Sequence, residues 1–320
     1  MNTSEEKRKL FQKFSEENED LLPFSLRYSW WNEVVGKSWD LTLISNENQV
    51  SAVWPYHIRK RGPWNLIVQP HFTPYSGVFM IYPEGSKAST KISFENKVCE
   101  ELINQLPDFD ELKQNFHLDF KNALPFVWEG FEDIKRYTYL LDLNPEKEII
   151  YENFRANIRK QIQKAEKQIE LKEATDSSNL KLAFEGSFQS QNIASPIDDK
   201  EIFQRIFDYV SKYKCGQVLE AFDADGNLHA AALFIWDKQQ AYYLIGGSVA
   251  TYKNSGAMSL LMWHGIQLAK EKGLNQFNFE GSSIKAIEKY LRGFGGELHS
   301  FSCIFKNNSK TLNLARKVKR

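Results

Sequence analysis

Two residues in the last part of the chain have side chains suited to proton transfer and charge stabilisation. Glu280 ends a segment, 276–280, that has the pattern of a strand, and small residues follow it. A carboxylate at the carboxyl end of a strand in an α/β sheet lies where ligands bind, and it can accept a proton from an amine. Arg292 lies in a glycine-rich hairpin turn over 290–296, where its rigid guanidinium can bind a carboxylate or a phosphate. We predict both as catalytic. The alternatives are that Glu280 caps the following turn and that Arg292 is a solvated turn residue.

The histidines and cysteines do not form a pattern typical of other kinds of catalysis. No HExxH, CxxC or Ser-His-Asp arrangement is recognisable, so neither a metal site nor covalent catalysis is predicted. Cys99, Cys215 and Cys303 are odd in number and widely spaced, which is typical of a reducing compartment. No apolar segment follows the charged start of the chain, and runs such as 230–236 are too short to cross a bilayer. We expect a cytoplasmic protein without a transmembrane segment.

The composition is that of a globular protein with two domains of ordinary size. The 320 residues are 42% hydrophobic and 26% charged, and the aromatic share of 14% favours a large core with an aromatic-lined groove. The net charge is zero, but residues 1–143 carry 16 Lys and Arg against 21 Asp and Glu. Since the chain holds 41 of each kind, the remainder carries 25 and 20. A polyanionic partner would therefore bind the second half, although a nucleic-acid-binding protein is usually more basic overall.

The hydrophobic pattern predicts an α/β protein with a mixed sheet, divided at Asn144-Pro145 into domains 1–143 and 144–320. In the first domain we expect helices over 3–17, 25–35 and 88–106 and strands over 41–44, 49–58, 64–69, 116–120 and 137–143. In the second we expect helices over 145–168, 176–192, 198–213 and 255–272 and strands over 217–223, 228–236, 241–246, 276–280 and 298–306.

The two halves match each other at a shift of 178 residues. Residues 48–52 then fall on 226–230, and 64–67 fall on 242–245, each followed by a loop, a helix and a strand. This shared order predicts a duplicated domain. The loop of the first half contains His71 and Tyr75 among prolines, and we predict that both bind substrate. The alternative for His71 is a structural role.

Four segments together resemble the Fem-type family of tandem GNAT-fold proteins, which includes aminoacyl-tRNA-dependent peptidyltransferases of cell-wall synthesis. These segments are Tyr243–Ser248, the helix from Ser255 to Gly273, Phe277–Ser282 and Tyr290–Gly296. The resemblance extends to the basic helix around 153–167 and implies two tandem GNAT-like (acyl-CoA N-acyltransferase fold) domains. It implies that the first domain binds the acceptor and that the second holds the active-site cleft. The expected function is an N-acyltransferase that transfers an acyl or aminoacyl group to an amine bound between the domains.

The resemblance also implies which residues hold the two substrates. The acceptor, a small molecule or a cell-envelope precursor amine, is expected to contact Tyr243, Ser248, Ser282 and Tyr290. The donor, an acyl-CoA or an aminoacyl-tRNA rather than a tightly bound cofactor, is expected near Asn254, Ser255, Gly256, Arg155 and Arg159. The two arginines belong to a basic helix that can contact phosphates of tRNA or another donor, or that is simply a solvated face.

The sequence departs from the family pattern at two places. The loop 252–257 keeps one glycine of the usual pyrophosphate-binding pattern, which disfavours ordinary acetyl-CoA chemistry. Tyr290-Leu291 stands where the family has Phe-Lys, and Arg292 is the nearest cation. A direct acyl-CoA-dependent acetyltransferase and a non-catalytic ligand-binding protein therefore remain alternatives.

Chain order leads to two expectations about placement. Glu280, Tyr290 and Arg292 should line one pocket near the N-terminus of the helix that starts at Ser255, because adjacent strand ends lie at one edge of a sheet. The basic C-terminal tail, 306–320, should share one side of the second domain with Arg155 and Arg159, or be a disordered end.

Overall fold

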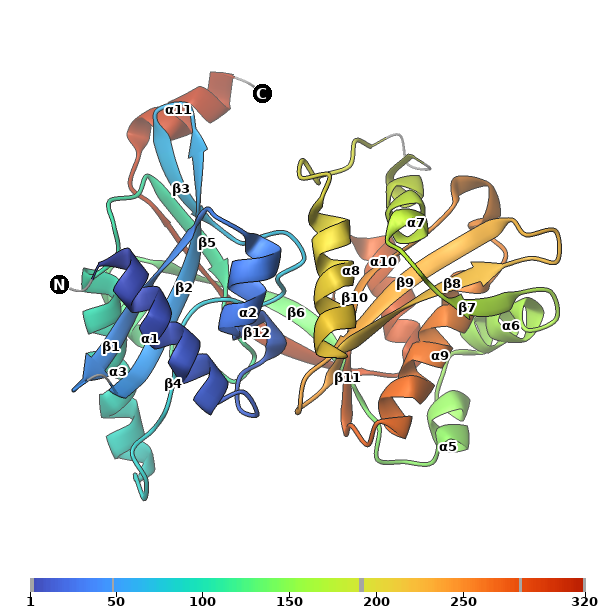
Figure 1. Ribbon diagram of the computed structural model, residues 1–320, viewed down its shortest axis with the longest axis horizontal. Helices are drawn as coiled ribbons and strands as arrows, with labels where there is room; N and C mark the ends of the chain where they lie inside the picture. Colours follow the sequence, from blue (N-terminus) through green and yellow to red (C-terminus); the bar gives the residue numbers. More distant parts are fainter. Residues whose placement is uncertain (1–2, 48, 190–192, 282–283, 319–320) are drawn as a thin grey trace. The chain divides into compact units, whose positions relative to one another are not determined.

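The chain forms two compact units in the computed structural model, which describes residues 3–47, 49–189, 193–281 and 284–318 (Figure 1). The first unit combines Met1–Arg136 with Ser300–Arg320, and the second is Tyr137–His299. The chain therefore passes between the units twice, within strand β6 (Glu132–Asp142) and within strand β12 (Glu297–Asn307). These units differ from the predicted domains 1–143 and 144–320, because the last strand of each half of the sequence is placed in the other unit.

The first unit is a mixed sheet with helices packed against it. Its strands are β1 (Trp39–Asn46), β2 (Gln49–Arg61), β3 (Trp64–Val68), β4 (Phe79–Met80), β5 (Glu111–Asn115) and the second part of β12. Its helices are α1 (Ser4–Glu17), α2 (Tyr28–Trp30), α3 (Ala88–Asn104), α4 (Leu124–Trp128) and α11 (Lys310–Val318), with a 3₁₀ turn at Phe24–Leu26 and a π-helical turn at Trp31–Val35.

Local sequence explains how the first unit begins. Thr3 and Glu6 form a capping box at the start of α1, with the Thr3 Oγ1 accepting from the Glu6 amide at 3.3 Å. Phe11 and Phe14 lie on one face of α1 and are buried. The strands β1, β2 and β3, which the sequence pattern predicts, pair in antiparallel order, and β5 then pairs with β3 in parallel.

The second unit is also a mixed sheet covered by helices. Its strands are β7 (Glu170–Glu173), β8 (Gly216–Phe222), β9 (Leu228–Trp236), β10 (Ala241–Ser248), β11 (Gln276–Asn278) and the second part of β6. Its helices are α5 (Lys147–Glu152), α6 (Ala156–Ala165), α7 (Ser178–Gln189), α8 (Ile202–Tyr213), α9 (Ala257–Glu271) and α10 (Lys285–Leu291), with 3₁₀ turns at Ala250–Tyr252 and Arg292–Phe294.

The central strand β9 is buried on both faces. Ala230, Ala232 and Phe234 belong to the core that α6 and α9 cover, while Leu233 and Ile235 alternate with them and are equally buried. Helix α7 approaches β10 so closely that a Cβ at Gly247 would lie 2.2 Å from the Ala183 carbonyl oxygen. A strand covered on both faces reads as a continuous apolar run, which is the pattern of 228–236.

The order of elements repeats between the units, as the duplication hypothesis requires. Three antiparallel strands, a helix and a strand parallel to the third occur as β1-β2-β3-α3-β5 and again as β8-β9-β10-α9-β11. One further antiparallel strand completes each set, and each set takes this strand from the other half of the sequence. Strand β6 follows β5 in the chain and pairs with β11, whereas β12 follows β11 and pairs with β5.

Several predicted elements differ from those observed. The prediction of a strand over 116–120 is wrong. The strand is β5, which ends at Asn115 and whose buried polar side chains interrupt the apolar pattern. Gln114 in β5 accepts from the Trp54 indole at 2.8 Å, so its burial carries no unsatisfied group. The helix predicted over 25–35 is interrupted by the extended residue Arg27. The long helix predicted over 145–168 is two helices, since Phe154 is buried and Arg155 is extended, with its amide donating to the Gly293 carbonyl.

The segments around Arg292 and at the C-terminus also correct the predictions. Helix α10 and a 3₁₀ turn replace the predicted turn over 290–296. The basic tail forms α11, which belongs to the first unit and not to the second domain with Arg155 and Arg159. Its anchor is Glu111 of β5, a buried carboxylate that pairs with Arg316.

The strand exchange predicts that the first unit needs the end of the chain. A fragment ending at residue 136 leaves one edge of β5 unpaired and removes Ile304 from the core. We expect this fragment to aggregate or unfold, and we expect residues 297–320, fused to it through a Gly/Ser linker, to restore a folded monomer. Circular dichroism and size-exclusion chromatography measure the outcome, with a scrambled 297–320 segment as the control. A folded fragment 1–136 would contradict the exchange.

Candidate functional site

Strands β10 and β11 separate soon after they begin to pair. Their parallel pairing covers Ala241 with Phe277 and Tyr242 with Asn278, whereas β10 continues to Ser248. The register of β10 against β9 shifts between Tyr243 and Ile245, which marks a bulge at the point of separation. Beyond Tyr242, no described residue continues the ladder on the β11 side of β10. Beyond this point the described residues of β11 do not pair with the backbone of β10.

Glu280 lies just past the end of β11, on the diverging side. Its amide donates to the Asn278 Oδ1 at 2.9 Å, and the same oxygen accepts from the Thr138 hydroxyl at 2.7 Å. The backbone of Glu280 is left-handed, with φ of 60°. Because few residues other than Gly and Asn adopt this conformation readily, a glutamate at this position costs backbone strain.

One oxygen of the Glu280 carboxyl group is buried. This oxygen, Oε1, is inaccessible to solvent and has no hydrogen-bond partner among the described residues, although the residue as a whole keeps some exposed surface. Burial raises the pKa of Glu280 well above its ordinary value. A buried, unpaired oxygen of this kind needs an explanation, and a positively charged or proton-donating ligand supplies one.

A second polar group lies at the N-terminal end of α9. The hydroxyls of Ser259 and Tyr290 are 3.2 Å apart, and Ser259 donates to the Gln161 Oε1 at 2.7 Å. Burial raises the pKa values of both Tyr290 and Tyr243, and the Tyr243 hydroxyl adds to the shift of Tyr290. Both phenols therefore stay protonated at neutral pH and can donate hydrogen bonds. Ser259 and Gln161 were missed in the sequence, where the only signal was a small polar residue within the apolar run 257–263.

Arg292 belongs to a different cluster. Its Nε lies 2.8 Å from the Glu288 Oε1, which also accepts from the Tyr139 hydroxyl at 2.5 Å. The Tyr139 hydrogen bond, with smaller effects of Arg292 and Arg155, lowers the pKa of Glu288. The Arg292 side chain is 46% exposed. Of the three residues expected in one pocket, Tyr290 reaches the start of α9, whereas Arg292 is directed to Glu288 beside Arg155.

The residues predicted to bind the donor lie around the start of α9 and along α6. Gly256 has φ of 89°, and a Cβ there would lie 2.4 Å from the Gln161 carbonyl oxygen, so α9 begins in close contact with α6. The Ser255 hydroxyl accepts from the Ala257 amide at 3.2 Å, and the exposed Asn254 accepts from Lys164 through its carbonyl at 3.1 Å. In this arrangement, the loop uses some of its polar groups internally.

The remaining predicted residues are spread over both units. Arg159 donates to the Glu152 carbonyl at 3.0 Å, and the Ser248 amide donates to the Ser187 hydroxyl at 3.1 Å. Tyr75 is 1% exposed and its ring packs edge-on against His117 and Phe301 in the first unit. His71, in the same loop, is half-buried. Ser282 lies outside the described residues.

Comparison with known proteins identifies the fold. Residues 152–290 match the family model of the acetyltransferase (GNAT) domain. The structure of FemX aligns with a TM-score of 0.63 at 11% identity, covering 98% of each chain. The C-terminal domain of a putative lysylphosphatidylglycerol synthetase from Agrobacterium fabrum aligns with a TM-score of 0.54 at 13% identity, covering 99% of this chain and 96% of that one. A tandem GNAT protein from the clavulanic acid biosynthesis pathway aligns with a TM-score of 0.51 at 10% identity, covering 85% and 83%. No curated protein matches the chain.

The protein thus has a tandem GNAT fold, which confirms the predicted fold class. Its fold is similar to that of FemX over almost the whole of both chains. The domain match over 152–290 indicates an acyltransferase that takes an acyl donor and an amine acceptor. Among the described residues, no helix is long and apolar enough to span a bilayer.

The burial of Glu280 predicts a pH-dependent cost in stability. A carboxyl group whose pKa is raised on folding binds its proton more tightly in the native state, so the free energy of unfolding falls as pH rises from about 4.3 to the native pKa. We expect Glu280→Gln to be more stable than the wild type at pH 8 and equal to it near pH 4. Urea unfolding across this range measures the difference. Glu297→Gln, which changes a carboxylate that is 88% exposed, should show no such trend.

Proposed function

We propose that the second unit transfers an acyl group to an amine at the point where β10 and β11 diverge, with Glu280 as the group that receives the amine. The observation that supports this most strongly is the buried Glu280 Oε1, which lacks a partner among the described residues. An ammonium group of the acceptor would satisfy this oxygen and lower the pKa of the carboxyl group toward its ordinary range. Glu280 can then hold the amine and take its proton.

In the proposed reaction, side chains transfer protons and backbone amides stabilise the developing charge. The amine nitrogen attacks the acyl carbon, a C–N bond forms, and the bond from that carbon to the sulfur or oxygen of the carrier breaks. Glu280 takes one proton from the bound ammonium before the attack, which frees the lone pair of the nitrogen, and the proton that the nitrogen loses after the attack passes to solvent. Unpaired amides of β10 beyond Tyr242 can donate to the carbonyl oxygen as negative charge develops on it. Tyr290, which stays protonated, is the proposed donor of a proton to the departing carrier.

For the donor, we propose an acyl group on a phosphate-bearing carrier, either an acyl-CoA or an aminoacyl-tRNA. Arg155 and Arg292 flank the single carboxylate of Glu288 on an exposed surface, so this cluster keeps a positive charge that can meet a phosphate. The loop before α9 supports a carrier bound differently from acetyl-CoA, because Ser255 and Asn254 are engaged within the protein. We propose a small molecule or a cell-envelope precursor as the source of the acceptor amine.

We also propose that the reaction takes place in the cytoplasm. Cys99, Cys215 and Cys303 are buried thiols. Thiols of this kind persist in a reducing compartment.

The decisive experiment compares donors and then removes the carboxylate. Thermal-shift measurements with acetyl-CoA, longer acyl-CoAs and aminoacyl-tRNA select the donor, and a panel of amines is then tested for turnover. We expect Glu280→Gln to lower kcat/KM about 10²- to 10⁴-fold, because it keeps the shape of the side chain and removes the base. In the wild type, kcat/KM should rise with pH until Glu280 is ionised, and the variant should lack this rise.

Glu297→Gln is the matched control, since it removes an exposed carboxylate of the same unit and should keep full activity. Unchanged turnover and an unchanged pH profile in Glu280→Gln would refute the role of Glu280. Tight binding of a donor without turnover of any amine would instead support a non-catalytic ligand-binding protein.

A further inference from the structure

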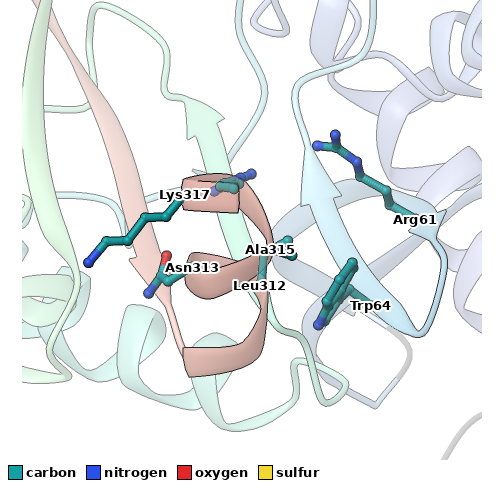
Figure 2. A pocket seen from close by; sticks show the side chains of 7 residues that line it. Arg61, Trp64, Leu312, Asn313, Ala315 and Lys317 are labelled. Atoms are coloured by element: carbon teal, nitrogen blue, oxygen red, sulfur yellow. The ribbon is translucent and has the colours of Figure 1, made fainter. Parts of the chain in front are cut away.

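A pocket of about 640 Å³ lies between the β2–β3 hairpin and α11, entirely within the first unit (Figure 2). Arg61 and Trp64 form one wall, and the helix forms the other. The volume is in the range of small-molecule sites and is much larger than a single inorganic ion requires. None of the residues proposed for acyl transfer belongs to this pocket, so it calls for an explanation of its own.

The lining combines an apolar floor with a cationic rim. Trp64, Leu312 and Ala315 provide the apolar surface, and Arg61 and Lys317 provide the charge, since Arg316 is paired with Glu111. No acidic side chain is found among the described residues that line it. The side chain of Arg61 has no hydrogen-bond or ion-pair partner in the described part of the chain, so its guanidinium can bind an anion without first losing a partner.

The indole of Trp64 is held in place. Its Nε1 donates to the Thr311 hydroxyl at 3.0 Å, which joins the hairpin to the first turn of α11. The ring therefore presents a fixed surface to the pocket, and little rotamer entropy is lost when a ligand packs against it.

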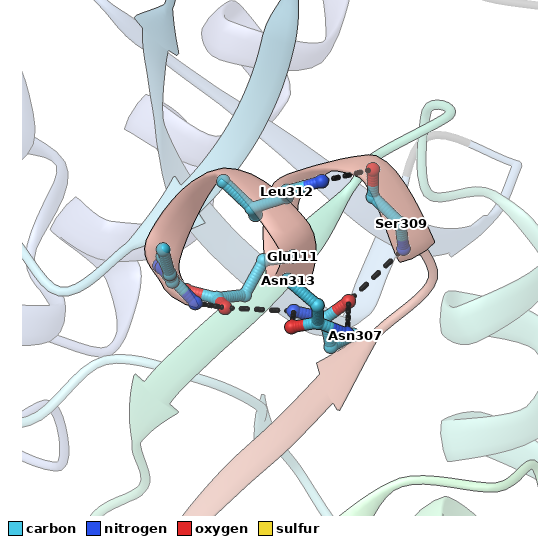
Figure 3. Close-up of polar contacts among 6 residues, drawn as sticks. Glu111, Asn307, Ser309, Leu312 and Asn313 are labelled. Carbon is cyan, nitrogen blue, oxygen red and sulfur yellow. Dashed lines mark hydrogen bonds and ion pairs between the residues drawn. The ribbon is translucent and has the colours of Figure 1, made fainter. Parts of the chain in front are cut away.

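Arg316 is fixed by the buried carboxylate of Glu111. Figure 3 shows Glu111 beside Asn307 and the start of α11. The Arg316 guanidinium contacts both oxygens of Glu111, with Nη2 at 2.9 Å from Oε1. The side-chain amide of Asn307 donates to Oε2 at 3.1 Å. Burial alone would raise the pKa of Glu111, but Arg316 holds it below its ordinary value, so the pair stays ionised. The Ser309 hydroxyl accepts from the Leu312 amide at 3.3 Å and caps the helix that forms the second wall.

We propose that this pocket binds a nucleotide, with a planar heterocycle stacked on Trp64 and a phosphate held by Arg61 at the rim. A phosphate alone would leave the apolar floor exposed, and an uncharged ring would leave the guanidinium of Arg61 unused. Arg316, already neutralised by Glu111, supports the shape of the pocket more than its charge, and Lys317 adds long-range attraction. The inference does not depend on the function proposed for the second unit.

Isothermal titration of the full-length protein with AMP, adenosine, inorganic phosphate and n-hexyl phosphate tests the proposal. We expect AMP to bind at least tenfold more tightly than the other three, and its affinity to fall with added salt. Hexyl phosphate that binds as tightly as AMP would overturn the stacked ring, and AMP that binds no better than adenosine would overturn the phosphate contact.

Substitutions locate the binding. We expect Arg61→Ala and Trp64→Leu each to weaken AMP binding about tenfold, because each removes one of the two contacts. Trp64→Phe keeps a ring but loses the bond to Thr311, and it should retain affinity within about threefold, which separates stacking from a general loss of structure. Lys60→Ala removes a neighbouring cation of β2 that does not line the pocket, and should have little effect. AMP affinity that survives both Arg61→Ala and Trp64→Leu would place the binding elsewhere and overturn the proposal.

Discussion

The pairing of β11 with β6 is the interaction on which the arrangement of the second unit depends. Three residue pairs join the strands, from Gln276 with Asp142 to Asn278 with Leu140, and the Phe279 amide extends the contact to the Tyr139 carbonyl at 3.0 Å. Backbone beyond Asn278 therefore follows β6, while β10 turns away. The separation that exposes the edge of β10 is thus imposed by a strand that the first half of the sequence provides.

This pairing also explains why the carboxylate of Glu280 is buried at a cost. The chain must leave β11 within two residues, and the left-handed conformation of Glu280 makes that turn. A glycine would satisfy the backbone with less strain, so the side chain at this position has a use other than folding. Burial without a partner among the described residues then raises the pKa of the group, which in the proposed reaction prepares it to exchange a proton with an amine. The same backbone constraint produces both the open strand edge and the perturbed acid beside it.

The sequence predicted the parts of the fold that follow from local pattern. The hydrophobic pattern located β1, β2, β3, β8, β9 and β10, and the repeated order of elements indicated the duplication. It could not predict the exchange of β6 and β12, because pairing partners far apart in the sequence leave no local trace. Strand β5 was missed since its buried polar residues, Gln114 and Glu111, are satisfied by Trp54 and Arg316 from distant elements.

The same limit holds for the candidate site: features of the local sequence could be predicted, and contacts between distant segments could not. Glu280 was found because a carboxylate after a strand is a local signal, whereas its partnerless burial depends on tertiary packing. Tyr290 was expected near the start of α9, but its contact with Ser259 was not, since α10 was read as a turn. Arg292 was predicted as a substitute for the missing lysine of the family pattern, yet one helical turn brings it to Glu288 instead. The cation nearest in sequence is therefore already paired with a carboxylate. We therefore propose that the chemistry at the strand divergence relies on backbone amides, protonated tyrosines and a single acid. These groups are sufficient for a transfer whose main demands are positioning and the removal of a proton.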